Sequence, residues 1–413
     1  MQHKVAITGM GIITAIGTTV DENLESLLQG KHGLTRLTQL ETVHSPDIFV
    51  GEIKWTNEEL IDRLDLPSDN SFTRTALLGA YAAKQAIDSA GIEDINAYKT
   101  GLISSTSVGG MDFTEKYFYD YFDKPETRKY ITSHHGGDSS KKIADYLGIE
   151  SVVTTISTAC SSAANAIMLG CRLIQSGKLD RVIVGGADAM SKFTINGFKT
   201  LMILSDEYNA PFDQNRKGLN LGEAAAYLVL ESERAITESG KTVLGYVCGY
   251  GNANDAFHQT ASSQEGEGAF LAMQKALQLA GIQPSEINYV NAHGTATGNN
   301  DLSEGRALLR VFNDEVPDMS STKPYTGHTL AAAGGIEAVF SLLAIKHNVV
   351  YPNLNFKTPM QEFNLIPQTK MVYKPIEYVL SNSFGFGGNC STVIFSKHGV
   401  NKRDEPVKSD NTN

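Results

Sequence analysis

The sequence contains little cysteine, a single tryptophan and fewer basic than acidic residues. Its four cysteines, among 413 residues, are far apart and form no CxxC pair, so neither a zinc site nor a disulfide framework is indicated. We therefore expect a reducing compartment, the cytoplasm. Lysine and arginine number 35 against 46 acidic residues, a net charge of −11. This balance argues against nucleic acid or an anionic membrane as the main partner.

Long apolar runs and a dinucleotide-binding motif are also absent. No run is long enough to cross a membrane, and threonines within the apolar residues 5–17 favour a first strand over a signal segment. The glycines after that strand do not form GxGxxG. What is present, 41% hydrophobic residues with 38 glycines, is typical of a compact α/β protein of one large or two fused domains.

The stretch that organises the chain surrounds Cys160. A β-branched run at residues 152–156 predicts a buried strand and residues 163–174 predict a helix, so Cys160 falls on the turn between them. Near a helix N-terminus, unpaired N–H groups and the helix dipole favour a thiolate. The alternative is a buried, inert cysteine, the commoner state of a lone cysteine in an apolar run.

The second half of the chain repeats the order of the first. Predicted helices end in Ala-Gly-Ile at residues 90–92 and again at 280–282, and each is followed by a strand, a small-residue turn and an alanine-rich helix. We therefore predict a duplicated βαβ fold in which the turns of Cys160 and His328 occupy equivalent places. Residues 20–71 are expected to be irregular.

Two of the ten histidines lie in small-residue loops. His293 ends a predicted strand and His328 begins a predicted helix. Such a histidine is often structural, but near a helix N-terminus an imidazole is biased towards its neutral form. Two neutral imidazoles aimed at one oxygen would stabilise an enolate or a thioester oxyanion without a metal. Lys323 and Glu337 form a further candidate pair, for which spacing alone favours a surface position.

Near the C-terminus, residues 382–389 interleave small residues with Phe384 and Phe386. This pattern suits a backbone N–H aimed at an oxyanion, beside an aromatic side chain that moves as a gate. The alternative is a tight turn after a strand at residues 378–380.

Taken in series, four motifs resemble the β-ketoacyl-acyl carrier protein synthases, most closely the elongating type II enzymes. The motifs are Thr158-Ala159-Cys160-Ser161-Ser162, Asn291-Ala292-His293-Gly294-Thr295, Lys323-Pro324-Tyr325-Thr326-Gly327-His328 and Asn382-Ser383-Phe384-Gly385-Phe386-Gly387-Gly388. The resemblance covers residues 5–396 and implies the thiolase-like α/β fold, five αβαβα layers built from two duplicated halves. We expect these halves at 1–245, with the nucleophile, and at 246–398, with both catalytic histidines, followed by a disordered tail at 399–413.

The resemblance implies a decarboxylative Claisen condensation that gives a β-ketoacyl carrier thioester. Cys160 would take an acyl chain from a carrier-protein thioester, with the backbone N–H groups of Cys160 and Phe386 as the oxyanion hole. His293 and His328 would stabilise the enolate formed when malonyl carrier protein loses CO2. The other implied roles are Lys323 as a catalytic residue paired with Glu337, Asp301 and Glu304 as supporting residues, and Val108 with Phe386 in the acyl pocket.

The resemblance also implies the partners. Substrates would arrive on the phosphopantetheine of an acyl carrier protein docked near Arg128 and Lys129, and neither a metal nor another cofactor would be required. The chain would form a homodimer, or be the active subunit of a heterodimer with a homologous ketosynthase-like chain-length subunit.

Several positions depart from the family pattern. Ala296 replaces Gly or Ser, Gly298-Asn299-Asn300 replaces a Pro-containing segment, and Asn389-Cys390 stands where Thr-Asn is usual. Ser157 also stands where an Asp commonly precedes Thr-Ala-Cys. The departures around Cys160 and the gate favour polyene or polyketide synthesis slightly over fatty-acid elongation. An alternative activity is a coenzyme A thiolase, for which Cys390 would supply a second catalytic cysteine; the motif at residues 323–328 favours the synthase.

Overall fold

The computed structural model describes residues 5–399. The predicted tail lies outside this range except for Gly399. The long strands are β1 (Val5–Ile13), β4 (Thr100–Ser105), β5 (Val152–Ile156), β6 (Arg181–Asp188), β7 (Ala224–Glu231), β8 (Gly245–Asn254), β13 (Tyr378–Gly385) and β14 (Asn389–Ser396). The short strands are β2 (Leu34–Arg36), β3 (Phe49–Gly51), β9 (Tyr289–Asn291), β10 (Asp318–Ser320), β11 (Val349–Val350) and β12 (Val372–Tyr373).

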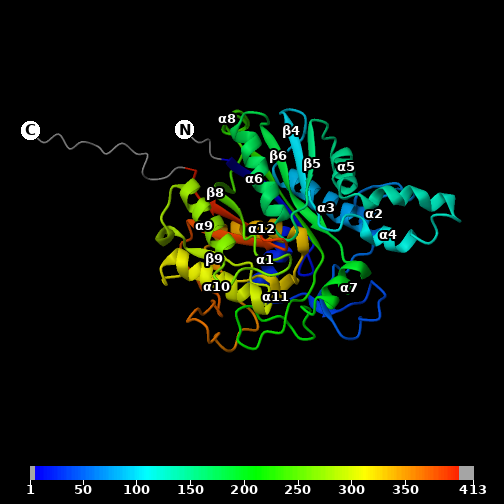
Figure 1. The fold of residues 1–413 in the computed structure, drawn as a ribbon. Helices are drawn as coiled ribbons and strands as arrows, with labels where there is room; N and C mark the ends of the chain where they lie inside the picture. Colours follow the sequence, from blue (N-terminus) through cyan, green and yellow to red (C-terminus); the bar gives the residue numbers. More distant parts are fainter. Residues whose placement is uncertain (1–4, 400–413) are drawn as a thin grey trace, which may run out of the picture.

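Helices connect these strands (Figure 1). The α-helices are α1 (Val20–Leu28), α2 (Asn57–Arg63), α3 (Arg74–Ser89), α4 (Met111–Tyr117), α5 (Gly136–Leu147), α6 (Ser162–Gln175), α7 (Lys192–Thr200), α8 (Glu233–Ser239), α9 (Glu267–Ala280), α10 (Gly298–Phe312), α11 (Lys323–Thr326) and α12 (Ala333–His347). The 3₁₀ helices are η1 (Pro125–His134), η2 (Pro284–Glu286) and η3 (Leu330–Ala332).

Within residues 5–399, ten strands form one sheet whose order is palindromic. The order is β10-β9-β13-β14-β8-β1-β7-β6-β4-β5, so the sequence of strands outward from β8 mirrors that outward from β1. The two halves meet where β1 pairs antiparallel with the start of β8. This arrangement confirms the predicted duplication. Because β5 corresponds to β10, the turns that carry Cys160 and His328 occupy equivalent places.

Five layers follow from the two-faced burial of the strands. On β7, Ala225 and Tyr227 pack in the cluster formed with α3, whereas Ala226 and Leu228 pack with α6 and α12. Alternate residues of a strand point to opposite faces, so α3 covers the outer face and α6 and α12 lie inside. Helix α9 covers β8 and β14 in the same way. The two halves of the continuous sheet thus form two β layers on either side of α6 and α12, and the order of layers is αβαβα, as predicted.

The same glycine spacing lets a helix approach the first strand of each half. A Cβ on Gly11 of β1 would lie 2.1 Å from the carbonyl oxygen of Ala82 on α3. A Cβ on Gly251 of β8 would lie 2.1 Å from that of Ala272 on α9. Only glycine permits such close backbone contact. The duplication therefore extends to individual packing contacts.

Helix α12 corrects one expectation. Residues 330–347, which include η3, are long and apolar enough to cross a membrane, and 89% of this segment is buried inside the protein. A helix that is apolar on all sides is typical of a protein core as well as of a membrane. Since α12 packs against α6, β7 and β13, the helix is part of the central layer.

Two further local expectations were wrong. Residues 20–71 contain α1, β2, β3 and α2; α2 begins with a capping box in which Thr56 and Glu59 each bond to the other's backbone N–H. Short elements of this kind carry little periodicity. Strand β13 also continues to Gly385, so the turn is limited to residues 386–388.

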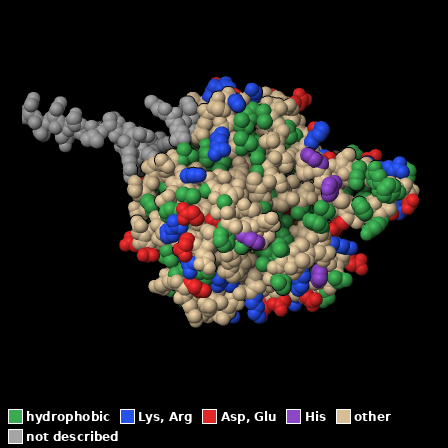
Figure 2. Space-filling model, viewed as in Figure 1, with side chains coloured by type: hydrophobic (Ala, Val, Ile, Leu, Met, Phe, Trp, Pro, Cys, Tyr) green, Lys and Arg blue, Asp and Glu red, His purple; other side chains and the backbone are tan. Residues whose placement is uncertain are grey.

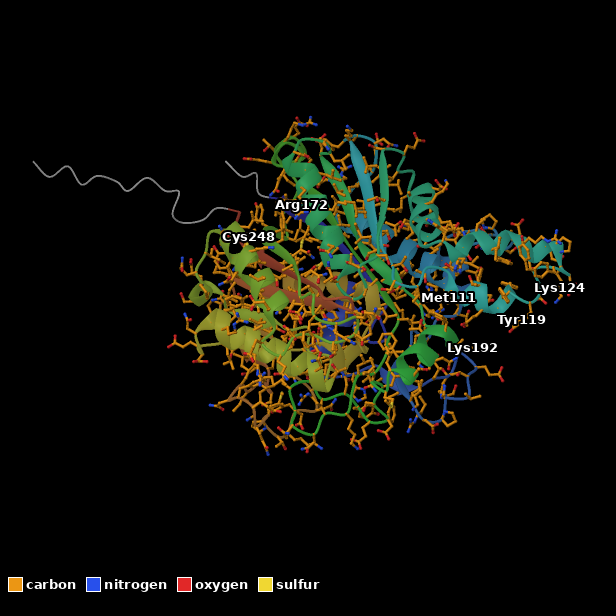
Figure 3. All side chains as sticks on the ribbon, viewed as in Figure 1. Met111, Tyr119, Lys124, Arg172, Lys192 and Cys248 are labelled. Carbon is orange, nitrogen blue, oxygen red and sulfur yellow. The ribbon has the colours of Figure 1, made fainter. Side chains whose placement is uncertain are left out.

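A projection, here called the arm, comprises α4, residues 118–124 and η1. It extends from the body of the molecule in Figure 1, with Met111, Tyr119 and Lys124 labelled along it in Figure 3. Hydrophobic side chains gather on it in Figure 2, and Phe118, Tyr119 and Phe122 are 56%, 85% and 78% exposed. Its base is fixed to α7, because Glu115 accepts hydrogen bonds from the first backbone N–H groups of that helix.

Candidate active site

Cys160 lies on a strained turn between β5 and α6. Ala159 has φ +52°, in the left-handed region that non-glycine residues rarely adopt. The turn is held by Ser162, whose Oγ accepts from the Thr158 N–H at 2.8 Å and donates to the Ala159 carbonyl. The strand-to-helix position predicted for Cys160 is therefore correct, and its side chain is 5% exposed.

Cys160 lines a cavity of about 130 Å³ together with His293, His328 and Phe386. These residues come from both halves of the chain. Phe198, Ile203 and Leu219 form an apolar part of the wall, and residues 260–262 and 297–300 form a polar part. The fold thus brings the predicted nucleophile, both predicted histidines and the predicted gate to one place.

The expectation of a stabilised thiolate was wrong for the free site. Burial raises the pKa of the Cys160 thiol to about 12, although the charge of Lys323 and the backbone N–H of Phe386 lower it. Desolvation disfavours the charged form and is the largest influence on this thiol. Cys160 is consequently a thiol at rest, close to the backbone N–H of Phe386.

His293 is held in a neutral form with its outer nitrogen free to donate. Burial, followed by the charges of Lys323 and His328, keeps its pKa well below 6.5. The Nζ of Lys323 lies 3.3 Å from Nδ1 of His293. Because an ammonium can only donate, this network assigns Nδ1 as the acceptor and leaves the proton on Nε2.

His328 reaches the same state through its own backbone. Its Nδ1 accepts from the Leu330 N–H at 3.3 Å, which again assigns the proton to Nε2. Burial and Lys323 keep its pKa well below 6.5. The segment at residues 220–222 holds the His328 backbone, with the Asn220 carbonyl accepting from its N–H at 2.7 Å. The two imidazole rings lie 5.4 Å apart at 85°.

Lys323 and Glu337 are buried rather than at the surface. Their Nζ and Oε1 atoms are 2.5 Å apart, and each side chain is 3% exposed. Glu337 also accepts from the Ser383 hydroxyl at 3.2 Å. Spacing alone misplaced this pair, because the helix that carries Glu337 is buried on every side.

Asp301 and Glu304 hold the loop of His293 through its backbone. Glu304 accepts from the N–H groups of His293 and Gly294 at 2.9 and 2.8 Å, and burial raises its pKa to about 7. Asp301 accepts from the N–H groups of Ala296 and Phe212, which both have positive φ. Neither carboxylate lines the cavity in the described chain.

Phe386 stands at the mouth of the cavity, on the turn between β13 and β14. Its ring is 36% exposed and stacks on Phe198, with centroids 5.9 Å apart and an interplanar angle of 24°. The following Gly387 has φ +83° and donates its N–H to the Gln259 carbonyl at 2.7 Å. A short glycine turn therefore carries the aromatic ring.

Lys323 and Glu337 do not line the cavity in the described chain, and neither do the residues predicted for the acyl pocket and for carrier docking, apart from Phe386. Val108 is absent from its described lining but packs in the same apolar cluster as Phe198 and Ile203. Arg128 and Lys129 lie on the arm; Arg128 donates to the Tyr121 and Phe122 carbonyls, and Lys129 donates to the Asp69 carbonyl.

Sequence reasoning missed a contact at the rim. The Ser262 N–H donates to Oδ1 of Asn299 at 2.6 Å, and Nδ2 of Asn299 donates back to the Ser262 carbonyl at 3.0 Å. Both residues line the cavity. Asn299 belongs to a segment that departs from the family pattern, and this departure was the feature of the sequence that could have pointed to it. The sequence around Phe198 contains no feature that predicts its place in the cavity wall.

The described residues contain no cluster of three or more His, Cys, Asp or Glu side chains positioned to hold a metal ion. The arrangement instead offers one thiol and two neutral N–H donors around a small cavity. Such donors can stabilise a negative oxygen that develops during a reaction.

Two family models match the chain. The Beta-ketoacyl synthase N-terminal domain matches residues 2–235, and the Beta-ketoacyl synthase C-terminal domain matches residues 244–357. A 3-oxoacyl-[acyl-carrier-protein] synthase 2 from Staphylococcus aureus strain N315 is 34% identical over 409 residues, covering 95% of this chain and 98% of the relative. The synthase of the same name from Synechocystis is 33% identical over 415 residues, covering 96% and 99%.

Solved structures are similar over nearly the whole chain. The ishigamide ketosynthase/chain length factor is 28% identical, with a TM-score of 0.90, covering 96% of this chain and all of that chain. A ketosynthase in complex with its chain length factor from Xenorhabdus doucetiae is 32% identical, with a TM-score of 0.83, covering 95% and 98%.

Proposed function

The chain belongs to the β-ketoacyl synthase family of acyl-transferring condensing enzymes, and on that premise we propose that it condenses malonyl carrier protein with an acyl chain held on Cys160. The product is a β-ketoacyl carrier thioester. The observation that carries this proposal is the meeting of one thiol and two neutral imidazoles in a single cavity.

The first step is acyl transfer. The sulfur of Cys160 attacks the carbonyl of an acyl carrier thioester, and the backbone N–H groups of Cys160 and Phe386 stabilise the oxyanion. The carrier thiol leaves and takes up the proton that Cys160 gives up. Because burial keeps the resting Cys160 protonated, proton loss accompanies attack.

The second step breaks the bond between the α-carbon of the malonyl group and its carboxylate. Carbon dioxide leaves, and the resulting enolate oxygen accepts from the Nε2–H groups of His293 and His328. The α-carbon then attacks the acyl carbonyl on Cys160, the carbon–sulfur bond breaks, and the sulfur that leaves takes up one proton from solvent water, which restores the Cys160 thiol. Lys323 keeps both imidazoles neutral, and Glu337 balances its charge.

We assign supporting roles to the remaining site residues. Asp301 and Glu304 fix the loop of His293, Phe386 is the gate, and Val108 bounds the acyl chain beyond Phe198 and Ile203. We also propose the division of the chain at 1–245 and 246–398.

The proposed partners are an acyl carrier protein and a second ketosynthase-like subunit. The carrier presents the substrates on phosphopantetheine and docks near Arg128 and Lys129, so no metal or further cofactor is required. The outer edge of β5, which pairs with no further strand within residues 5–399 and where Val153 is 39% exposed, and the aromatic arm supply a surface for the second subunit. We place the enzyme in the cytoplasm, as the scattered positions of the four cysteines along the sequence favour.

A second candidate is the active subunit of a heterodimer in polyene or polyketide synthesis. Similarity to ketosynthases solved with a chain length factor favours it. The thiolase alternative is disfavoured, because Cys390 packs in the apolar cluster of β14 and α9 and is absent from the described lining of the cavity.

The test is reconstitution with malonyl carrier protein and a panel of acyl carrier proteins. Intact-protein mass spectrometry should show acylated enzyme and a β-ketoacyl carrier. Native mass spectrometry of the enzyme, alone and co-expressed with a homologous subunit that lacks the cysteine, distinguishes the two candidates. Failure to form β-ketoacyl product with every primer, in both assemblies, contradicts the proposal.

A further inference from the structure

A cluster of uncharged polar side chains lies behind the nucleophile turn. We call it the polar knot; its members are Thr158, Ser161, Asn165, Asn252, Asn389 and Ser391. The knot joins the two halves of the fold, because Ser161 and Asn165 belong to the nucleophile turn and α6, whereas Asn252 and Asn389 belong to β8 and β14. No step of the condensation described above uses these side chains.

The side-chain oxygen of Asn389 is the common acceptor of the knot. It accepts from the Ser161 hydroxyl at 2.7 Å and from the amide groups of Asn165 and Asn252, both at 2.9 Å. The Ser391 hydroxyl lies 3.4 Å from the same oxygen. An amide oxygen has two lone pairs, so these donors share the Asn389 oxygen, and the Ser161 hydroxyl divides its single proton between this oxygen and the Thr158 carbonyl.

Each donor also has a second acceptor: the Ser161 hydroxyl lies 2.8 Å from the Thr158 carbonyl oxygen, the Asn165 amide lies 2.9 Å from Oγ1 of Thr158, and the Asn252 amide lies 3.0 Å from Oγ of Ser391. Truncating Asn389 would therefore remove the shared acceptor and leave the two halves joined within the knot, among the described residues, only through the side-chain oxygen of Asn165.

The position of Asn389 links this acceptor to the oxyanion hole. Asn389 pairs with Gly385 across the hairpin, and residues 386–388 form the turn between them. Gly385 already touches the nucleophile turn: a Cβ there would lie 2.6 Å from the Thr158 carbonyl oxygen and 3.2 Å from the Cys160 nitrogen. Contact at Gly385 and hydrogen bonds at Asn389 therefore bracket Phe386 on both sides.

We propose that Asn389 is a positioning residue that sets the distance between the Phe386 and Cys160 backbone N–H groups, and hence the fit of the oxyanion hole. The inference rests on the proposed function. It predicts a selective defect, because acyl transfer to Cys160 uses both N–H groups, whereas decarboxylation of malonyl carrier protein uses His293 and His328.

The test compares Asn389→Ala and Asn389→Thr with the wild type in two partial reactions. One is acylation of Cys160 by the acyl carrier that acylates the wild type best, followed by rapid quench and intact-protein mass spectrometry. The other is decarboxylation of malonyl carrier protein without primer. Misplacing one oxyanion donor should slow acylation by Asn389→Ala at least tenfold at saturating acyl carrier, with decarboxylation within twofold of the wild type. Asn389→Thr keeps an acceptor oxygen, so its acylation rate should lie between those of Asn389→Ala and the wild type.

Asn288→Ala is the matched control. The Asn288 side chain also holds the β13 backbone, by accepting from the N–H groups of Glu377 and Tyr378 at 2.8 and 2.9 Å, but at the opposite end of the strand. Its acylation rate should stay within twofold of the wild type. Unchanged acylation in Asn389→Ala, or a parallel loss of both partial reactions, overturns the inference. Absence of acylation in the wild type would instead contradict the proposed function.

Discussion

The turn after β5 and the turn after β10 occupy equivalent places in the two halves, yet the side chains around them differ in charge. The first presents Cys160 among serines and asparagines that hold no charge. The second presents His328 beside the buried ion pair of Lys323 and Glu337. The two halves therefore share the same backbone arrangement at this position, and the side chains on it differ in chemistry.

The difference explains how one cavity can serve two steps. The side chains of the polar knot behind Cys160 carry no charge, although the charges of Lys323 and Asp188 still act on the thiol with opposite signs. The two histidines must instead stay neutral to act as hydrogen-bond donors. The buried ammonium of Lys323 serves this purpose, because it suppresses protonation of both imidazoles.

The largest expected effects come from replacing Cys160 on one turn and His328 on the other, because each change should impair a different partial reaction. Cys160→Ala should lower condensation by about 10³-fold or more, since no acyl-enzyme can form, and should retain decarboxylation of malonyl carrier protein. His328→Ala should lower decarboxylation about 10²- to 10³-fold and leave acylation of Cys160 within a few-fold. Quenched-flow mass spectrometry of both partial reactions checks this. Condensation by Cys160→Ala would show that the nucleophile is elsewhere.

The buried pair gives the next effect. Glu337→Ala leaves Lys323 buried without its partner and should lower the free energy of unfolding by about 3–5 kcal/mol, measured by urea denaturation. Replacing both residues, as in the Lys323→Met, Glu337→Leu double variant, should cost less than the single change. Lys141 and Asp145 form a pair that is 73% and 63% exposed, so Asp145→Ala should change stability by less than about 1 kcal/mol. Equal losses at the two sites would contradict the burial argument.

A third prediction asks whether the two halves are matched in packing. Gly11→Ala and Gly251→Ala each push a methyl group against a helix carbonyl at the same separation, so each should destabilise the protein by about 1–3 kcal/mol. Thermal unfolding of the two variants should give similar losses. Gly91→Ala tests a glycine with φ +59° and open space around it, so its cost should reflect backbone strain alone. A loss confined to one half would show that the contacts are not equivalent.

The smallest effect concerns pH. Both histidines have a pKa held well below 6.5 in the folded protein, so they stay neutral as the pH falls through 6.5. Decarboxylation by Cys160→Ala should therefore change by less than about twofold across that range and decline only at lower pH. Unfolded histidines take up protons below 6.5, so their contribution to stability is full above 6.5 and is lost as the pH falls. A decarboxylation rate that falls by half near pH 6.5 would show instead that the pKa of a catalytic imidazole is not lowered in the folded protein.

The sequence predicted the features that depend on order and on periodic burial. The duplicated strands, the turn of Cys160 and its equivalence to His328 follow from β-branched runs and small-residue turns. The location of Lys323 and Glu337 did not follow, because their spacing is the same for a surface pair and a buried one. The pKa of Cys160 depends on how completely the other half covers it, and the contact of Asn299 with Ser262 joins segments that are distant in sequence.

The small cavity beneath Phe386 has an energetic consequence. At about 130 Å³ it is below the range of about 300–1,000 Å³ in which ligand pockets usually fall. On the proposal that Phe386 is the gate, an acyl chain enters only when the ring leaves Phe198. Every primer then binds a minor open population, and its apparent dissociation constant is the intrinsic one divided by the open fraction. The proposed gate therefore predicts that weakening the stack of Phe386 on Phe198 tightens the binding of all primers by a common factor, whereas the role proposed for Val108 predicts that changes there act on long chains alone.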